Sequence, residues 1–253
     1  MRTPTSQPDM SSGTFTRDDG RAPEREGARV ADGNRHRRLD ALLTPRSAAV
    51  LTVECRRGVV RPGGALPELA AAVRASGALE ATGRLVAAAH AAGATVVHAV
   101  AERRADGRGS SRNARIFRAA ERLPVPQVAG TPAVEVAEEI AVGAGDLVVR
   151  RLHGLSPVAG TGLDAVLRNL GVRTVVVTGV SANVAVPNAV FDVVNLGYEA
   201  VVPADAIAGV PQSYTADMLR HTLALVATVT TTDEVIGSWE RSGPGPGDSG
   251  QGH

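Results

Sequence analysis

Short apolar segments alternate with longer amphipathic ones through the middle of the chain. The apolar segments are rich in β-branched residues, which is typical of strands buried on both faces of a parallel sheet. We predict strands at residues 48–53, 95–100, 146–149, 174–178, 200–202 and 228–230, and helices at about 82–92, 133–139, 162–170, 183–196 and 216–225. This alternation predicts an α/β fold, a doubly wound three-layer sandwich around a mostly parallel sheet of about six strands.

Both ends of the chain lack this pattern. Residues 1–45 and 241–253 are rich in Gly, Pro, Ser and charged residues, and they bury too little apolar surface to offset the entropy of ordering. We therefore expect a disordered N-terminal arm (1–45), one domain (46–240) and a flexible C-terminal tail (241–253). The basic cluster at 35–38 would suit a nucleic acid or an acidic partner, but a solvated charge run is the simpler interpretation.

Composition narrows the class of protein further. The 27 Lys and Arg residues nearly balance the 26 Asp and Glu residues, so the whole chain has no excess charge for binding a nucleic acid. One cysteine excludes an intramolecular disulfide and a cysteine-based zinc cluster. The chain has no apolar run near the length that spans a bilayer and no apolar secretory signal, so we expect a cytoplasmic protein without a membrane partner.

Polar residues follow the predicted strands, at the sheet edge where doubly wound folds bind ligands. Each of the first five predicted strands is followed by at least one candidate functional residue. In chain order they are Glu54, Cys55 and Arg56; Glu102, Arg103 and Arg104; Arg150, Arg151 and His153; Ser181, Ala182 and Asn183; and Asp205.

Five segments in the same order resemble the isochorismatase-like hydrolases, a superfamily that also contains nicotinamidases and N-carbamoyl amidohydrolases. The resemblance covers about residues 46–240. It rests on residues 48–58 (AAVLTVECRRG), 130–131 (GT), 145–151 (GDLVVRR), 160–163 (GTGL) and, most specifically, 174–186 (TVVVTGVSANVAV). It implies the doubly wound fold and a homodimer or homotetramer.

The resemblance also implies three site positions. Family members use an Asp at the end of the first strand, a Lys after the third, and a Cys at the start of the helix after the fourth. The Asp position is Glu54 here, and the Lys position is Arg151, or Leu152 in a second alignment of the loop. The Cys position is Ala185. All three residue types have changed.

Ala185 excludes catalysis through a thioester, because a methyl group cannot act as a nucleophile. Cys55 is a poor substitute for the missing thiol. Successive side chains of a strand point to opposite faces, so Cys55 should point away from the side that Glu54 faces. We interpret it as a small buried hydrophobic residue.

Glu54 has two interpretations that the residues leave open. A carboxyl group at the end of an apolar strand is desolvated, which raises its pKa and suits a general acid. The resemblance offers a precedent, since isochorismatases proper protonate a vinyl ether with the carboxyl group of the first strand. Alternatively, Arg150 or Arg151 pairs with Glu54 and holds it ionised, which makes it a poor acid.

The remaining candidates suit an anionic substrate. Arg151 and Arg150 present planar, permanently charged forks for a carboxylate, and His153 on the same loop is either an acid/base group or a hydrogen-bonded loop residue. The loop at 102–115 carries Arg103 and Arg104 and is either a lid that holds an anion or a solvated loop. Its Asp106 has no neighbouring His, so we predict neither a catalytic metal nor another cofactor.

The segment from Ser181 to Ala185 offers a further anion site. Backbone N–H groups around Ala182 and Ala185 at a helix N-terminus would bind an anion. Asn183 either caps this helix or faces the pocket. The resemblance implies a cis peptide bond between Val180 and Ser181.

Three functions therefore remain. The first is a hydrolase, or a related lyase, that acts on a small anionic metabolite without a cysteine nucleophile, with Glu54 as general acid, Arg151 and His153 as further catalytic groups, and the other polar residues as substrate contacts. The second is a catalytically inactive relative that binds a metabolite or a partner protein. The third, an interaction protein that works through its basic arm, leaves the polar strand ends unexplained.

Overall fold

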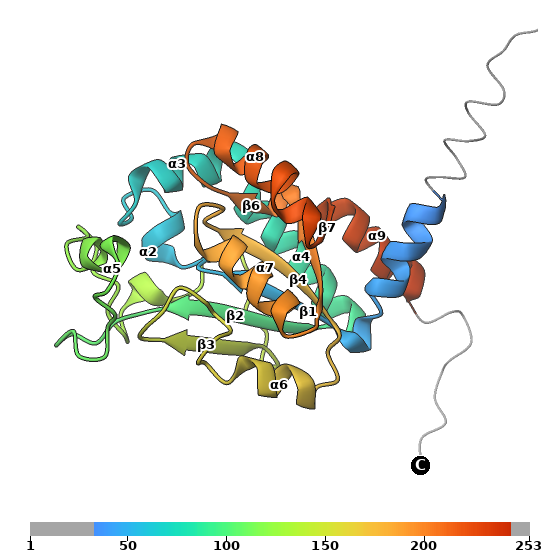
Figure 1. Cartoon of the computed structure of the whole chain (residues 1–253), viewed down its shortest axis with the longest axis horizontal. Helices are drawn as coiled ribbons and strands as arrows, with labels where there is room; N and C mark the ends of the chain where they lie inside the picture. Colours follow the sequence, from blue (N-terminus) through green and yellow to red (C-terminus); the bar gives the residue numbers. More distant parts are fainter. Residues whose placement is uncertain (1–32, 244–253) are drawn as a thin grey trace, which may run out of the picture. The chain divides into compact units, whose positions relative to one another are not determined.

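A single parallel sheet organises the part of the chain that the computed structural model describes, residues 33–243 (Figure 1). The strands are β1 (Ala48–Val53), β2 (Thr95–Ala101), β3 (Leu147–Arg151), β4 (Thr174–Val180), β5 (Glu199–Pro203), β6 (Ile207–Ala208) and β7 (Thr228–Thr230). Their order is β3-β2-β1-β4-β5-β7, and β6 pairs with the end of β4. The predicted sheet is confirmed, with β6 as an addition that is too short for a sequence pattern to mark.

Helices cover both faces of this sheet (Figure 1). They are α2 (Arg57–Val60), α3 (Pro67–Ser76), α4 (Ala78–Ala92), α5 (Arg115–Ala120), α6 (Leu163–Asn169), α7 (Ala185–Asn195), α8 (Gln212–His221) and α9 (Thr232–Ser242). Short 3-10 turns lie at η1 (Pro45–Ser47), η2 (Pro132–Val134), η3 (Ala204–Ala206) and η4 (Leu223–Leu225). None of the helices among these residues is long and apolar enough to cross a membrane.

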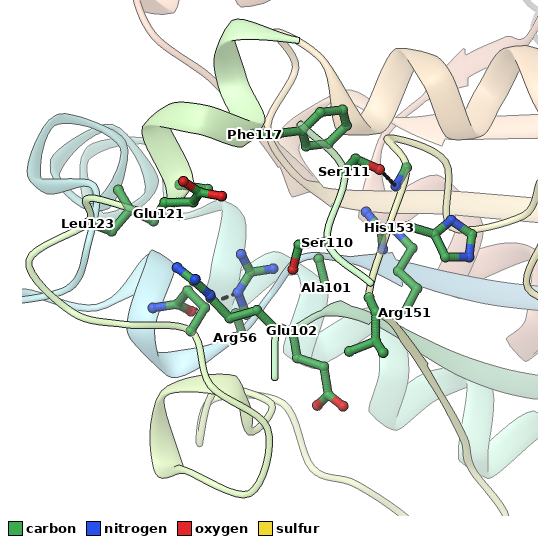
Figure 2. A pocket seen from close by; sticks show the side chains of 15 residues that line it. Arg56, Ala101, Glu102, Ser110, Ser111, Phe117, Glu121, Leu123, Arg151 and His153 are labelled. Carbon is green, nitrogen blue, oxygen red and sulfur yellow. Dashed lines mark hydrogen bonds between the residues drawn. The ribbon is translucent and has the colours of Figure 1, made fainter. Parts of the chain in front are cut away.

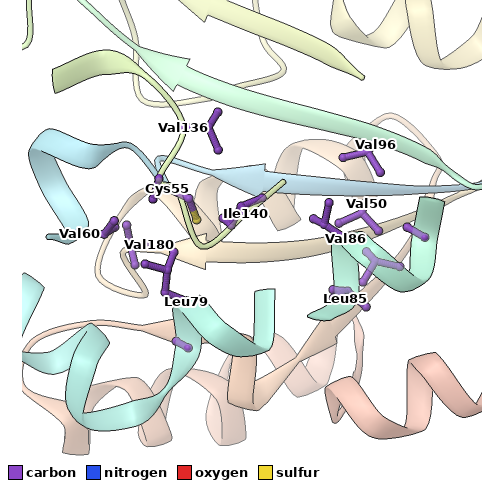
Figure 3. Packing of buried hydrophobic residues seen from close by; sticks show 14 of the residues in the cluster. Val50, Cys55, Val60, Leu79, Leu85, Val86, Val96, Val136, Ile140 and Val180 are labelled. Atoms are coloured by element: carbon purple, nitrogen blue, oxygen red, sulfur yellow. The ribbon is translucent and has the colours of Figure 1, made fainter. Parts of the chain in front are cut away.

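Alternate residues of the central strands pack into two separate hydrophobic cores. Val50 of β1 lies in the core under α3, α4 and α9, whereas its neighbour Leu51 lies in the core under α6 and α7. Figure 3 shows the first core, where Leu85 and Val86 of α4 pack towards the sheet. Two cores on opposite faces of one sheet make the three-layer sandwich that the periodicity predicts.

The helix predicted at 133–139 is wrong. Only η2 forms there, and the following residues run beside the segment after β1, where Arg57 N donates to Glu135 O and Ala137 N donates to Cys55 O, both at 2.9 Å. These backbone bonds satisfy the same groups that a helix would have used. Sequence analysis also missed α3 and α9, although Thr231 and Glu234 form a capping box at the start of α9.

The predicted boundaries of the domain also need correction. Two units are distinguished in the chain, residues 1–37 and 38–253. Residues 33–42 are helical, and within the second unit Leu39 and Leu43 are buried. Trp239 Nε1 donates to Leu43 O at 2.9 Å, so α9 is fixed to this segment and continues to Ser242, beyond the predicted limit of 240. The remainder of the predicted arm (1–32) and tail (244–253) lies outside the described residues.

Candidate anion-binding site

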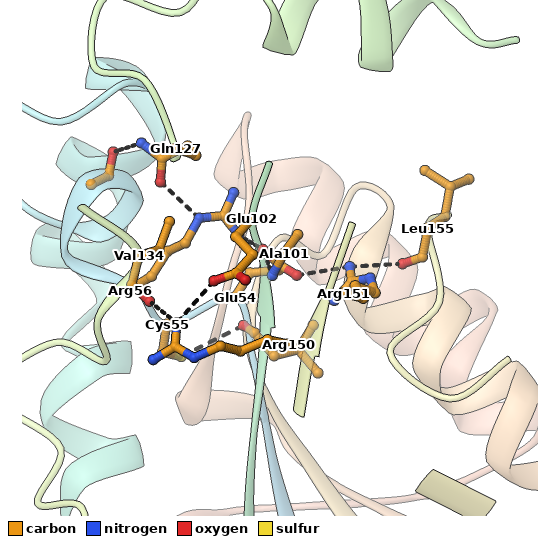
Figure 4. Close-up of polar contacts among 12 residues, drawn as sticks. Glu54, Cys55, Arg56, Ala101, Glu102, Gln127, Val134, Arg150, Arg151 and Leu155 are labelled. Carbon is orange, nitrogen blue, oxygen red and sulfur yellow. Dashed lines mark hydrogen bonds and ion pairs between the residues drawn. The ribbon is translucent and has the colours of Figure 1, made fainter. Parts of the chain in front are cut away.

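Glu54 begins the site at the carboxyl end of β1. Its φ of 57° is in the left-handed region, which residues other than glycine rarely adopt. Its backbone N–H still pairs with Ala99 O at 3.0 Å, so the strand continues to Glu54 before the chain turns. The side chain is buried and lies between β2, β3 and the residues that follow β1 (Figure 4).

Both oxygens of the Glu54 carboxylate contact an arginine. Arg151 Nη2 lies 2.7 Å from Oε1, and Arg56 Nη1 contacts Oε2. The backbone N–H of Ala101 also donates to Oε2, at 3.4 Å. The predicted pairing of Glu54 with Arg151 is therefore present. A second arginine, Arg56, to which sequence analysis gives no role, pairs with the other oxygen of the carboxylate.

The cluster contains more positive than negative charge. The side chains of Arg56 and Arg151 are only 12% and 4% exposed, and the two share a single carboxylate. Burial, together with repulsion from Arg151, lowers the pKa of Arg56 to about 9, and burial lowers the pKa of Arg151 to about 10. Because both pKa values are lowered, the surroundings provide too little negative charge for two guanidinium groups.

Some polar atoms of the cluster remain without a partner. Arg56 Nε donates to Gln127 Oε1 at 2.8 Å, and Arg151 Nη2 donates to Leu155 O at 3.3 Å. Within residues 33–243, however, Arg151 Nε and Nη1 are buried and have no hydrogen-bond acceptor, and Ser110 Oγ is buried and has no partner either. Buried donors of this kind are costly unless a ligand or water satisfies them.

A pocket of about 110 Å³ opens beside the two arginines (Figure 2). Its lining combines the ends of β2 and β3 with α5 and the loops around it. It is formed by Arg56, Ala101, Glu102, Arg103, Ser110, Ser111, Phe117, Ala120, Glu121, Leu123, Gln127, Arg151, Leu152, His153 and Gly154. The predicted residues Arg103, Arg151 and His153 therefore lie around one pocket, and Glu54 lies behind the two arginines.

Two of the predicted substrate contacts are engaged elsewhere. Arg150 pairs with Glu102 at 3.1 Å and with Glu135 at 3.2 Å, because alternate residues of β3 point to opposite sides and Arg150 therefore points away from the side of Arg151. Arg104 is exposed and pairs with Asp106 at 2.9 Å. Neither arginine lines the pocket.

The segment before α7 uses its polar groups within the protein. Ala182 N donates to Ala208 O at 2.9 Å, so it is not free for an anion. Asn183 neither caps α7 nor lines the pocket, since its side chain donates to Val210 O at 2.6 Å and accepts from Val210 N at 3.0 Å. The peptide bond between Val180 and Ser181 is cis, as the resemblance implies. Ser181 and Ala185 also lie outside the pocket lining.

Cys55 is turned into the hydrophobic core (Figure 3), as strand alternation predicts. Its Sγ lies 3.6 Å from Val53 O, and burial raises the pKa of the thiol to about 12. A thiol with this pKa is almost entirely protonated at neutral pH and is a weak nucleophile. Among the described residues, no group of three or more His, Cys, Asp or Glu side chains could hold a metal ion.

Sequence analysis gives Arg56 as a strand-end candidate without a role, and it misses Gln127 and Phe117. Arg56 had a usable signal, because it lies two residues after Glu54 at the end of a strand, where side chains two apart share a side. Gln127 and Phe117 come from loop and helix segments far from Glu54 in sequence. Their approach to the arginines depends on the tertiary fold, and no local sequence pattern predicts it.

Comparison with known proteins agrees with this architecture. The family model of the isochorismatase domain matches residues 48–234. No curated protein sequence matches the chain significantly. The structure of a cysteine hydrolase from Pseudomonas syringae pv. phaseolicola 1448A is similar with a TM-score of 0.70 and 27% identity, over 79% of this chain and 96% of that one.

Two further solved structures extend the comparison. An isochorismatase family protein from Desulfovibrio vulgaris subsp. vulgaris str. Hildenborough has a TM-score of 0.66 and 25% identity, over 76% of this chain and 99% of that one. The N-carbamoylsarcosine amidase from Thermoplasma acidophilum shares the fold, with a TM-score of 0.58 and 24% identity over 74% and 97% of the two chains. Because the family model matches residues 48–234, most of its length, this chain belongs to the isochorismatase family of hydrolases.

Proposed function

We propose that the pocket binds a small anionic metabolite through Arg56 and Arg151, without a cysteine nucleophile. One observation carries the proposal. Two buried guanidinium groups share the single carboxylate of Glu54, and Arg151 keeps Nε and Nη1 without an acceptor among the described residues. An anion would supply both the missing charge and the missing acceptors.

In this proposal Glu54 is the fixed counter-ion of the site and not its general acid. A general acid must hold a proton before it can donate it. Two guanidinium groups in contact with the carboxylate favour its ionised form and oppose protonation. Of the two interpretations of Glu54, the geometry therefore favours the structural one.

Thioester chemistry has no support in the described site. The residue that the resemblance aligns with the family cysteine is Ala185, and the sole thiol, Cys55, lies in the core with a raised pKa. A reaction in this pocket would therefore not proceed through a thioester.

A thermal-shift titration with sodium acetate, benzoate and phosphate tests the anion site. At least one salt should raise the melting temperature of the wild type, relative to sodium chloride at equal ionic strength, and should fail to do so in Arg151→Gln. Arg104→Gln is the matched control, because this exposed arginine pairs with Asp106 and neither residue lines the pocket, and it should respond as the wild type does. Equal responses of Arg151→Gln and the wild type, or no response of the wild type to any salt, would contradict the proposal.

Hydrolysis of a bound anionic substrate is the second candidate, and the position of His153 favours it. His153 lines the same pocket, with its ring exposed on the side away from Arg56 (Figure 2), and an imidazole ring can accept and return a proton. Water would add to a carbonyl carbon of the substrate, with its proton passing to His153 and then to the leaving group. The arginines would hold the substrate's anionic group.

Mass spectrometry separates binding from hydrolysis. The protein would be incubated with carboxylate-bearing amides and esters, such as N-benzoylglycine, and the products analysed. The hydrolase candidate requires products with the wild type and their loss with His153→Gln, with an unchanged melting temperature. Binding without any product would leave anion binding as the function, whereas product formation that survives His153→Gln would remove His153 from the mechanism.

A further inference from the structure

The pocket beside Arg56 and Arg151 has two chemically different sides. The buried N–H donors come from the sheet side, at the ends of β1 and β3. The side of α5 provides Phe117, Ala120 and Leu123 (Figure 2). Leu152 and Ala101 add further apolar surface between them.

From this division, which rests on the proposed anion site, we infer that the ligand is a carboxylic acid with one anionic group and a compact apolar body, of about the size of one six-membered ring. The carboxylate lies against Arg56 and Arg151, and the body packs on Phe117 and Leu123. Enclosed cavities of about 150 Å³ accept benzene. The pocket of about 110 Å³ is smaller but open, so a body of one ring would extend into its mouth and a larger body would not be covered.

The charged groups at the mouth disfavour a second negative group on this body. Two carboxylates, Glu102 and Glu121, line the pocket together with Arg103. Glu121, which pairs with Arg112 at 2.7 Å, lies on the side of α5 beside the apolar wall, whereas the Glu102 carboxylate turns towards Arg150, with which it pairs at 3.1 Å (Figure 2). A neutral amide of the same shape would accept hydrogen bonds from the buried guanidinium groups through its oxygen, but it would bring no negative charge to balance them, so these bonds would be weaker.

Isothermal titration calorimetry at neutral pH tests the inference with four probes. Benzoate should bind more tightly than acetate by about tenfold or more, because only benzoate places a ring on the apolar wall. Benzamide, which has the ring without the charge, and phthalate, which has a second carboxylate, should each bind at least about tenfold more weakly than benzoate.

A pair of neighbouring variants on α5 assigns the effect to the apolar wall. Phe117→Ala should weaken benzoate binding by about tenfold and leave acetate binding unchanged, since a lost aromatic contact costs about this much. Ile116→Ala removes a side chain that is 47% exposed and does not line the pocket, and it should change neither affinity.

The outcomes separate this inference from the proposed function. If acetate binds as tightly as benzoate, or if Phe117→Ala behaves as Ile116→Ala does, the apolar body is wrong while the anion site stands. Benzamide binding as tightly as benzoate would remove the requirement for charge. If neither acetate nor benzoate binds and phosphate gives no thermal shift, the anion site itself is wrong and the inference falls with it.

Discussion

Arg151 Nη2 lies 2.7 Å from Glu54 Oε1, and the opposite oxygen of the same carboxylate contacts Arg56 (Figure 4). This relationship decides the role of Glu54. A carboxyl group at the end of a buried strand would be a candidate acid if it stood alone. Between two guanidinium groups it is a counter-ion, and the excess positive charge becomes the property of the site that an external anion can use.

Removal of the shared carboxylate should destabilise the protein more than removal of either arginine. Glu54→Gln leaves two buried guanidinium groups without a counter-ion, and we expect a loss of about 3 kcal/mol or more in the free energy of unfolding. Arg151→Gln leaves a one-to-one pair of Glu54 with Arg56 and should cost less. Urea denaturation of the two variants and the wild type measures the difference.

Glu138 provides a matched control for this experiment. It also contacts two arginines, Arg57 at 3.0 Å and Arg61 at 2.7 Å, but its side chain is 58% exposed. Glu138→Gln should therefore cost much less than Glu54→Gln, because exposed ion pairs contribute little to stability. Sodium benzoate should stabilise Glu54→Gln at least as much as the wild type, because the anion replaces the lost charge. Equal costs for the variants at 54 and 138 would contradict the account.

The thiol of Cys55 should be unreactive in the folded protein. Burial raises its pKa to about 12, and the side chain lies in the hydrophobic core. Iodoacetamide at neutral pH should label Cys55 in urea but not in native buffer, because only the thiolate reacts and the core excludes the reagent. Mass spectrometry measures the labelled fraction, and rapid labelling of the native protein would reopen a nucleophilic role for this residue.

Acid should destabilise the fold through a second polar cluster in the sheet. His98 is fully buried, and its Nε2 pairs with Asp146 Oδ2 at 3.0 Å, while His90 Nε2 pairs with Asp146 Oδ1 at 2.8 Å. Burial outweighs the attraction of Asp146 and lowers the pKa of His98 below its usual 6.5. For Asp146, burial acts to raise the pKa, but hydrogen bonds from Gly143 N, His98 and His90 lower it below 3.8.

Both His98 and Asp146 make the folded protein less stable as the pH falls. As the pH falls through about 6.5, the unfolded chain binds a proton at His98 before the folded chain does, so stability falls. The stability that comes from Asp146 is present above 3.8 and is lost as the pH falls below that value. Urea denaturation at a series of pH values should show the first loss in the wild type and in His153→Gln. A smaller loss is expected in His98→Gln, and an equal slope in all three would exclude His98 as its source.

The segment before β1 should contribute to stability, contrary to the expectation of an irregular arm up to residue 45. Leu43 is fully buried, and its carbonyl accepts from Trp239 Nε1. Leu43→Ala should lower the free energy of unfolding by about 2–5 kcal/mol, the range for a leucine lost from a core. Leu225→Ala is the control, since its side chain is 81% exposed and its loss should cost no more than about 0.5 kcal/mol.

The periodicity of apolar residues predicts most of the strands of the fold and about half of its helices correctly. The strands at 48–53 and 228–230 match the prediction to the residue, because short runs rich in β-branched residues favour strands. The helix at 133–139 failed because its backbone pairs with the segment after β1, a long-range contact that local pattern does not encode. The helix at 33–42 was missed because its few apolar residues lie among many charged ones.

The site was predictable only in part. Glu54, Arg151 and His153 follow strands, and the rule that ligands bind at strand ends was sufficient to select them. Arg150 was selected by the same rule and points to the other side, since the rule does not distinguish the two sides of a strand. Phe117 on α5 and Gln127 on a loop reach the pocket through tertiary contacts that no periodicity describes.

A crystal structure of the protein with sodium benzoate would show directly whether Arg56 and Arg151 bind the carboxylate of a ligand. A carboxylate oxygen of benzoate should lie at hydrogen-bond distance, about 2.7–3.2 Å, from Nε or Nη1 of Arg151, with Glu54 still ion-paired behind it. Benzoate bound away from both Arg56 and Arg151, or these arginines without ligand in crystals soaked well above the measured dissociation constant, would contradict it.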